Sequence, residues 1–474
     1  MGAGINARPS TVRTHHLGLN DSALIVISLD QAETSCQRKL SISLADAPHI
    51  QTVELYQLES VGSPPLPDKM IPLQLASMTL TAPPRTMVLK IGTTDTIGRA
   101  NETVSITLSS ANNSSSRKLD IAYLPYSASP QRQTIIQANL QPRGISIADD
   151  DYLRLVKYLV ARGFSSFLFR PRDYHDAARL TALLTTLQSS RGRPIVKIPA
   201  RRLYDRKHRP TFSAQGHSLT SWAKAECRHI TKYYEKIRET GYAGDISYKI
   251  WDEPVESQYP LVRRMYDAVH DCLPGPVLLE LSEHPADTLG SSVGVWVSHI
   301  DDMRQAGNER ARPTAIQLVY ANKLHSPTEP PYAMRNIGFL MWHFNADGYH
   351  FWSLIDYRNG ASTGPYTRAN AAWRGALLYV DGPGKIYPSF RLEQFLQGIE
   401  DMMLLKQMEN DNSAAAGHLT ARLRKTISRS HAFSSPSLRL IRPRKNSRDS
   451  LELGDLAREL SSLVSTGYRE LTLP

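Results

Sequence analysis

The chain has 474 residues, of which 41% are hydrophobic and 21% are charged. This balance supports packed cores and excludes wholesale disorder. At about 100–200 residues per domain, the length predicts two to four domains. No apolar run reaches the roughly 18–20 residues of a membrane helix. The first twenty residues have no apolar core, so we expect no secretory signal and, on the chain as given, a cytoplasmic protein.

The first residues, 1–19, are expected to form a flexible N-terminus. Residues 20–128 are then rich in short β-prone runs, such as ALIVISL, TVELYQL and TVSITL, which Pro, Gly, Asn and Ser separate. Several short strands with frequent turn signals are typical of a β-sandwich. We therefore predict an all-β domain over 20–128.

The pattern changes in residues 129–410, where apolar strand-like runs alternate with amphipathic helical stretches. Strands that alternate with helices indicate a parallel sheet, and eight of them favour a (β/α)8 TIM barrel. The eight predicted strands are 133–139, 165–170, 194–199, 246–251, 276–281, 293–298, 314–320 and 348–354.

The formal net charge of +11 is concentrated near the C-terminus. Residues 411–450 hold nine Lys and Arg against two Asp, which is nine minus two or +7, so the rest of the chain carries only +4. A Ser-rich basic run of this kind predicts a solvated linker, with weak polyanion contact as an alternative. Residues 451–474 follow it and are expected to form an amphipathic C-terminal helix.

The cysteine pattern argues against metal binding. Cys36, Cys227 and Cys272 form no CxxC pair and no Cys/His ligand spacing. This pattern excludes a zinc framework and a disulfide scaffold, and predicts three buried or free thiols. The chain also lacks GxxxxGK[ST] and has no GxGxxG after the first barrel strand, so no metal or organic cofactor is expected.

Reacting groups in a barrel come from the C-terminal ends of its strands. The fourth predicted strand ends in Trp251-Asp252-Glu253-Pro254. Burial beside an indole raises a carboxyl pKa, and a raised pKa suits a general acid near neutral pH. Asp252 and Glu253 are therefore the predicted catalytic residues. The alternative is a solvated loop pair in which Asp252 caps the next helix.

Other strand ends supply the predicted substrate-binding residues. Aromatic rings at several ends suit the apolar faces of sugars. With Trp251, this set comprises Arg170, Glu280, His299, Tyr320, Trp352, Asp356 and Tyr357.

The seventh strand ends without an acid, at Tyr320-Ala321-Asn322. A conventional retaining glycosidase needs a second carboxylate about 5–5.5 Å from the acid. Either another strand supplies it, or a 2-acetamido group of the substrate acts as the nucleophile. In the second case Asp252 would polarise the amide and Glu253 would protonate the leaving oxygen.

Three segments resemble glycoside hydrolase family 123 and the wider group with the domain of unknown function 4091. They are YKIWDEP (248–254), MRNIGFLMWHFNADGYHFWSLIDY (334–357) and GALLYVDGPGKIYPSFRLEQFLQGIEDMMLL (375–405). The order of sandwich and barrel also matches. The resemblance implies a retaining β-N-acetylhexosaminidase of N-acetylgalactosaminide type, with Asp252 orienting the acetamido group, Glu253 as acid/base and Tyr320 as the aromatic of the seventh strand.

Two further expectations concern export and a structural role of the third segment. Members of this family are commonly exported, although no signal is visible in this chain. In the third segment, four charged residues are expected to pin the last helix to the barrel rim. They are Arg391, Glu393, Glu400 and Asp401.

Three other functions stay open at this stage. The first is a catalytically silent protein that binds carbohydrate or assembles polysaccharide, because a fold does not fix function. The second is a conventional glycosidase acting on a sugar without an acetamido group. Its third acid would come from Glu280, Glu283, Asp301, Asp302 or Asp356. The third is a polyanion-binding protein that uses 411–450, with steeply salt-dependent binding.

Overall fold

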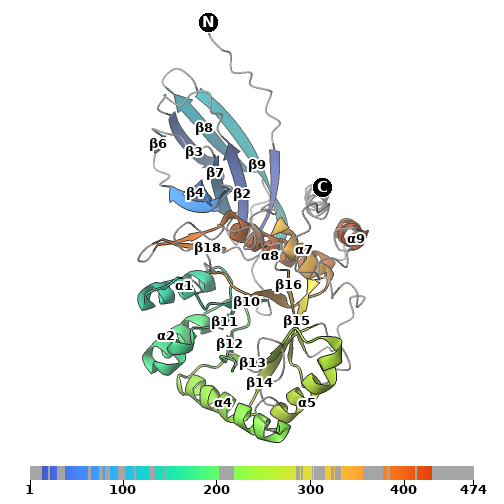
Figure 1. The fold of residues 1–474 in the computed structure, drawn as a ribbon. Helices are drawn as coiled ribbons and strands as arrows, with labels where there is room; N and C mark the ends of the chain where they lie inside the picture. Colours follow the sequence, from blue (N-terminus) through green and yellow to red (C-terminus); the bar gives the residue numbers. More distant parts are fainter. Residues whose placement is uncertain are drawn as a thin grey trace.

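The chain folds into an N-terminal β-sandwich and a barrel, with helix α8 at their junction (Figure 1). This computed structural model describes residues 13–19, 22–28, 38–61, 66–73, 78–80, 86–93, 102–110, 114–127, 134–142, 145–201, 218–283, 289, 292–300, 303, 315–321, 325, 333–355, 377–381, 385–410 and 414–429.

The sandwich has two sheets, in the orders β1-β9-β8-β3-β6 and β2-β7-β4-β5. Its strands are β1 (Arg13–Leu19), β2 (Ser22–Ser28), β3 (Arg38–Asp46), β4 (Ile50–Val61), β5 (Leu66–Leu73), β6 (Met78–Leu80), β7 (Thr86–Thr93), β8 (Glu102–Ser110) and β9 (Ser114–Ser127). Alternate residues of the two sheets, such as Leu55, Leu89 and Val104, form the core between them. The described part of 20–128 contains no helix, as predicted.

The sandwich begins earlier than the sequence indicated. Strand β1 starts at Arg13 and pairs in parallel with β9, so the expectation of a flexible 1–19 was wrong for residues 13–19. The backbone groups of this segment are satisfied by a long-range partner about a hundred positions away, which no local pattern reveals.

The second body is a closed barrel of eight parallel strands in chain order, and each predicted strand overlaps an observed one. They are β10 (Ile135–Asn139), β11 (Ser166–Leu168), β12 (Ile195–Lys197), β13 (Asp245–Asp252), β14 (Val277–Ser282), β15 (Val295–His299), β16 (Ile316–Tyr320) and β17 (Gly348–Phe351). The helices around it are α1 (Asp149–Ala161), α2 (Ala177–Gln188), α4 (Leu219–Glu239), α5 (Tyr259–His270) and α7 (Asn336–His343), with the short 3₁₀ turns η1 (Pro171–His175) and η2 (Glu256–Gln258).

The barrel interior changes from apolar to polar along the strands. Near their starts the interior is packed by Ile135, Ile195 and Ile316. Two residues further along β10 and β12, Gln137 and Lys197 are buried, and both hydrogen-bond to Glu280 of β14. Strands β10 and β14 are opposite in the barrel, so these side chains fill its interior. The polar half lies toward the C-terminal face, where active sites of this fold are built.

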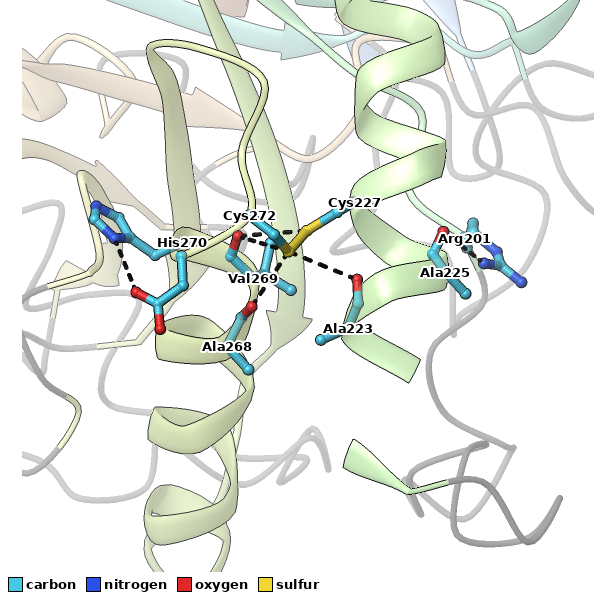
Figure 2. Close-up of a disulfide and its surroundings, with 9 residues drawn as sticks. Arg201, Ala223, Ala225, Cys227, Ala268, Val269, His270 and Cys272 are labelled. Atoms are coloured by element: carbon cyan, nitrogen blue, oxygen red, sulfur yellow. Dashed lines mark hydrogen bonds and ion pairs between the residues drawn. A yellow bond between two sulfur atoms is a disulfide. The ribbon is translucent and has the colours of Figure 1, made fainter. Parts of the chain in front are cut away.

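A disulfide corrects the expectation of three thiols. Cys227 of α4 and Cys272, just after α5, are bonded, with Cα atoms 6.0 Å apart and 45 positions between them in sequence. Figure 2 shows the bond joining the two helices. The sequence did not predict this pair because its spacing fits no motif: the two residues meet only when α4 and α5 pack side by side on the barrel.

Two helices follow the barrel and a short hairpin of β18 (Leu378–Asp381) and β19 (Lys385–Pro388). They are α8 (Phe390–Glu409) and α9 (Ala414–Arg429). The start of the predicted 411–450 linker is therefore helical, and Leu419, Leu423 and Ile427 are buried against the body. Their four-residue spacing puts them on one helix face, an apolar signal that the charge count concealed. Residues 430–450 and the predicted helix in 451–474 lie outside the described residues.

Charged residues of α8 join the sandwich to the barrel. Arg391 forms two hydrogen bonds to Asp68 of β5, at 3.0 and 2.8 Å. Glu393 binds Lys90 of β7 at 2.7 Å and also Arg162, just after α1. We call these five residues the interdomain charge cluster.

The other two of the four predicted residues, Glu400 and Asp401, also lie on α8. Asp401 binds Arg335, just before α7, at 2.6 Å, so α8 is held to the barrel as predicted. Glu400 is half-buried. The sequence did not reveal that Arg391 and Glu393 would also hold the sandwich.

Candidate active site

Glu253 follows β13 in a strained backbone conformation. Its φ is 48°, in the left-handed region, although the residue before a proline favours extended conformations. A conformation of this kind costs about 1–3 kcal/mol and clusters at functional sites. The amide of Glu253 still donates to the Ser282 carbonyl at 3.0 Å. The chain therefore leaves the strand only after this last pairing with β14. The direction of the Glu253 side chain is then no longer set by the alternation of inward and outward side chains along β13.

Tyr320 ends β16, the seventh strand, and reaches Glu253 across the barrel. Its hydroxyl donates to Oε1 of Glu253 at 2.6 Å. The ring of His299, from the end of β15, lies edge-on to the Tyr320 ring with centroids 5.0 Å apart. Three predicted site residues from three strands thus meet at the C-terminal end of the barrel. We call this region, with Asp252 and Lys249, the barrel mouth.

Asp252 is held as a carboxylate. Lys249 donates to its Oδ1 at 2.8 Å. The charge of Lys249 lowers the pKa of Asp252 against the opposing effect of burial, with further help from a Ser282 hydrogen bond and from Lys197. The expectation that burial beside an indole would raise this pKa was therefore wrong for Asp252, because the charge of Lys249 outweighs the effect of burial. The arrangement favours an ionised group that accepts hydrogen bonds.

Two predicted substrate contacts are structural. The Trp251 side chain is 1% exposed and belongs to the core between the barrel and its helices, so it offers no surface to a sugar. Arg170 is buried, binds Asp173 at 2.7 Å and Asp149 at 3.0 Å, and stacks on Tyr152. Its guanidinium is used to join the loops that follow the first two strands.

Glu280 lies below the mouth. It is fully buried, and Lys197 donates to it at 2.6 Å. A carboxylate so enclosed and paired is a poor candidate for substrate contact. Trp352, which follows β17, is half-buried at the end of the eighth strand. Asp356 and Tyr357 lie outside the described residues, as do Asp301 and Asp302.

Sequence reasoning missed Lys249. The strand ISYKIWD places Ile246, Tyr248 and Ile250 on alternate positions, which leaves Ser247 and Lys249 on the other face. A lysine on the interior face of a barrel strand, three residues before the Asp-Glu pair, was a readable signal.

Two broader features of the described residues bear on the kind of protein. Among them, there is no cluster of three or more His, Cys, Asp or Glu side chains that could bind a metal ion. Within the same residues, no helix combines the length and apolar character that crossing a bilayer requires.

The fold is that of a sandwich-plus-barrel protein, and a solved structure shares it. A family 123 glycoside hydrolase from Clostridium perfringens superimposes with a TM-score of 0.64 at 13% identity, over 97% of this chain and 93% of that one. An endo-β-1,4-mannanase from Thermotoga petrophila gives a TM-score of 0.34 at 10% identity, over 60% and 80% of the two chains. No protein-family model and no curated protein sequence matches the chain.

The similarity to the Clostridium perfringens structure covers nearly the whole of both chains. It confirms the fold that the sequence resemblance to family 123 implied. At 13% identity it speaks to the fold alone.

Proposed function

We propose that the protein is a retaining β-N-acetylhexosaminidase that acts on N-acetylgalactosaminides by substrate-assisted catalysis. The observation that carries this proposal is the pairing at the barrel mouth. A carboxylate held ionised, Asp252, directly precedes an exposed acid, Glu253, whose backbone is strained and whose side chain accepts from Tyr320. Neighbouring acids in such different surroundings suit two different roles.

In the proposed reaction, protonated Glu253 gives its proton to the glycosidic oxygen as the bond to the anomeric carbon breaks. The acetamido oxygen of the same sugar attacks that carbon and forms an oxazolinium ion. Asp252 accepts the amide N–H and stabilises the developing positive charge. Glu253, now a carboxylate, takes a proton from water as the water oxygen attacks the anomeric carbon. The bond from that carbon to the acetamido oxygen breaks, which restores the acetamido group and leaves the sugar with its configuration retained.

The neighbours of Glu253 support this chemistry over that of a conventional retaining enzyme. The group that reaches it from the seventh strand is the Tyr320 hydroxyl, not a carboxylate. Glu280, one of the acids that a conventional mechanism could use, is enclosed and bound to Lys197. The family 123 glycoside hydrolase from Clostridium perfringens was analysed for glycolipid glycan hydrolysis. Glycoconjugates are therefore the first substrates to try.

The test is a panel of nitrophenyl glycosides with and without 2-acetamido groups, assayed with wild type and Asp252→Asn. We expect turnover of acetamido sugars and a large loss in Asp252→Asn. Turnover of sugars that lack the group, with no loss in the variant, would indicate the conventional mechanism. Saturable sugar binding without turnover would indicate the silent carbohydrate-binding protein.

We also infer from the disulfide that the protein folds in an oxidising compartment. Disulfides persist in extracellular, periplasmic and similar environments and are rare in the cytosol. The Cys227–Cys272 bond therefore supports export. Localisation by fractionation of the native host tests this, and a protein confined to a reducing cytosol would contradict it.

A further inference from the structure

Strand β13 contains a β-bulge just before the catalytic pair. In its pairing with β14, Lys249 is opposite Glu280 and Trp251 is opposite the very next residue, Leu281. Ile250 is therefore an extra residue on β13. Bulges of this kind bend a strand and redirect the side chains that follow, and they are common beside active sites.

The bulge decides which side chains share the barrel interior. In a regular strand, residues three apart point to opposite faces. Lys249 and Asp252 are three apart, yet Nζ and Oδ1 lie 2.8 Å from each other. Ile250 and Trp251, each 1% exposed, both pack in the outer core. The extra residue is thus accommodated outside, and Lys249 and Asp252 both face inward.

Other charged or titratable groups surround this pair. Of the two lysines that act on Asp252, Lys197 is already bound to Glu280 at 2.6 Å, deeper in the barrel. Lys249 is the one in direct contact. Among the described residues, Lys197 on β12 and Tyr266 on α5 interact electrostatically with Asp252, and His350 on β17 does so with Lys249. Glu280 on β14 is opposite Lys249 in the strand pairing. Glu253, which accepts from Tyr320 of β16, directly follows Asp252.

We propose that Lys249 is a positioning residue of this site: the bulge brings its ammonium group to Asp252, where it orients the carboxylate and keeps it ionised for the substrate amide. This inference rests on the proposed function. A carboxylate has about four lone-pair positions. Lys249 and Ser282 occupy two of them, which leaves capacity for the acetamido N–H.

The first test is the pH profile of kcat/KM on a nitrophenyl 2-acetamido glycoside. Lys249→Met and the smaller change Lys249→Gln remove the cation, Lys249→Arg retains it, and Lys236→Met is the matched control. Lys236 is another half-buried lysine, on α4, which donates to the Tyr174 carbonyl. Thermal unfolding establishes that each variant is folded.

The direction of the expected shift in the pH profile follows because the ionised form of Asp252 is the active one. Without the cation, Asp252 holds its proton to higher pH, so the acid limb of the profile should move up by about 1 pH unit or more. Lys249→Arg and Lys236→Met should keep the limb where wild type has it. A uniform loss of activity in Lys249→Met and Lys249→Gln, with the limb unmoved, would overturn the inference.

A second test does not need activity. In protein labelled with ¹³C at Asp carboxyl carbons, the signal absent from Asp252→Asn belongs to Asp252. It should titrate at higher pH in Lys249→Gln than in wild type. An unchanged titration would reject the role of Lys249 even if the enzyme hydrolyses acetamido sugars. If the titration shifts but the protein does not hydrolyse acetamido sugars, Lys249 still controls the ionisation of Asp252, and the proposed function is rejected.

Discussion

The barrel mouth and the interdomain charge cluster both bring carboxylates against cations, but they do so in different surroundings. In the cluster, Asp68, Arg391 and Glu393 are 3%, 1% and 2% exposed, and each charge has a partner from another element. At the mouth, Glu253 is exposed and its backbone is strained. Complete pairing holds two domains together, whereas the proposed general acid is exposed and its backbone is strained. The variants below test whether this difference separates structure from chemistry.

The largest expected effect on stability is in the cluster. Glu393→Gln leaves Lys90 and Arg162 without their carboxylate, and breaking a buried pair costs about 3–5 kcal/mol. Urea unfolding at neutral pH measures this loss. The control is Asp245→Asn, which breaks an exposed pair with Arg193 and should cost about 1 kcal/mol or less.

The same variant has a defined pH dependence. Lys90 and Arg162 hold the pKa of Glu393 below its ordinary value of 4.5, although burial alone would raise it. The stabilisation is therefore complete above about pH 4.5 and is lost as the pH falls through the lower folded value. The gap between wild type and Glu393→Gln should shrink below pH 4.5. A gap that stays constant with pH would contradict the ion pairing.

The disulfide should give the next largest effect. Replacing Cys227 and Cys272 together by Ala should lower the free energy of unfolding by about 2–4 kcal/mol. Wild type under reductant should lose a similar amount, and the double variant should not respond to reductant. Denatured, unreduced wild type should show one reactive thiol, from Cys36. Three reactive thiols would contradict the bond.

The contact between α7 and α8 should give a smaller effect. A Cβ on Gly338 would lie 1.7 Å from the Gly398 carbonyl oxygen, so Gly338→Ala must push the helices apart, at about 1–3 kcal/mol. Gly417 of α9 meets nothing within 4 Å. There the same exchange should stabilise by about 0.5–1 kcal/mol, the helical preference of Ala over Gly. Destabilisation by Gly417→Ala would contradict a helix at this position.

The smallest expected effect tests the strain at the mouth. A left-handed residue is easier for Gly than for Ala, so Glu253→Gly should be more stable than Glu253→Ala by about 1 kcal/mol. The control is Lys157, exposed on α1, where Gly should be the less stable by a similar amount. If Ala is more stable than Gly at both positions, the backbone of Glu253 is not strained.

Much of the architecture could be predicted because it rests on local periodicity. All eight barrel strands and the absence of helix from the described sandwich follow from runs of apolar residues and their breaks. The rule that active sites lie at strand ends then brought Asp252, Glu253, His299 and Tyr320 to one mouth. Long-range pairing had no such signal, so β1 and the disulfide were missed.

Two errors at the site, at Trp251 and at Lys249, have one physical origin. The inserted Ile250 shifts the alternation of β13, so Trp251 lies in the outer core and Lys249 joins Asp252. A bulge depends on pairing with a neighbouring strand and cannot be read from one segment. The prediction that Arg170 binds substrate was wrong for another reason. Its partners Asp149 and Asp173 come from the surrounding loops and helices, and no sequence pattern indicates that they pair with it.

Glu253 is the proposed general acid at the mouth. The most direct test of this assignment compares Glu253→Gln with wild type on two 2-acetamido glycosides, one with a poor leaving group and one with an activated aryl group. The poor leaving group needs protonation, so its turnover should fall further, by about 10²–10⁴-fold, while the activated substrate is partly spared. Equal losses on both substrates would contradict the assignment, and full activity on both would place the chemistry elsewhere.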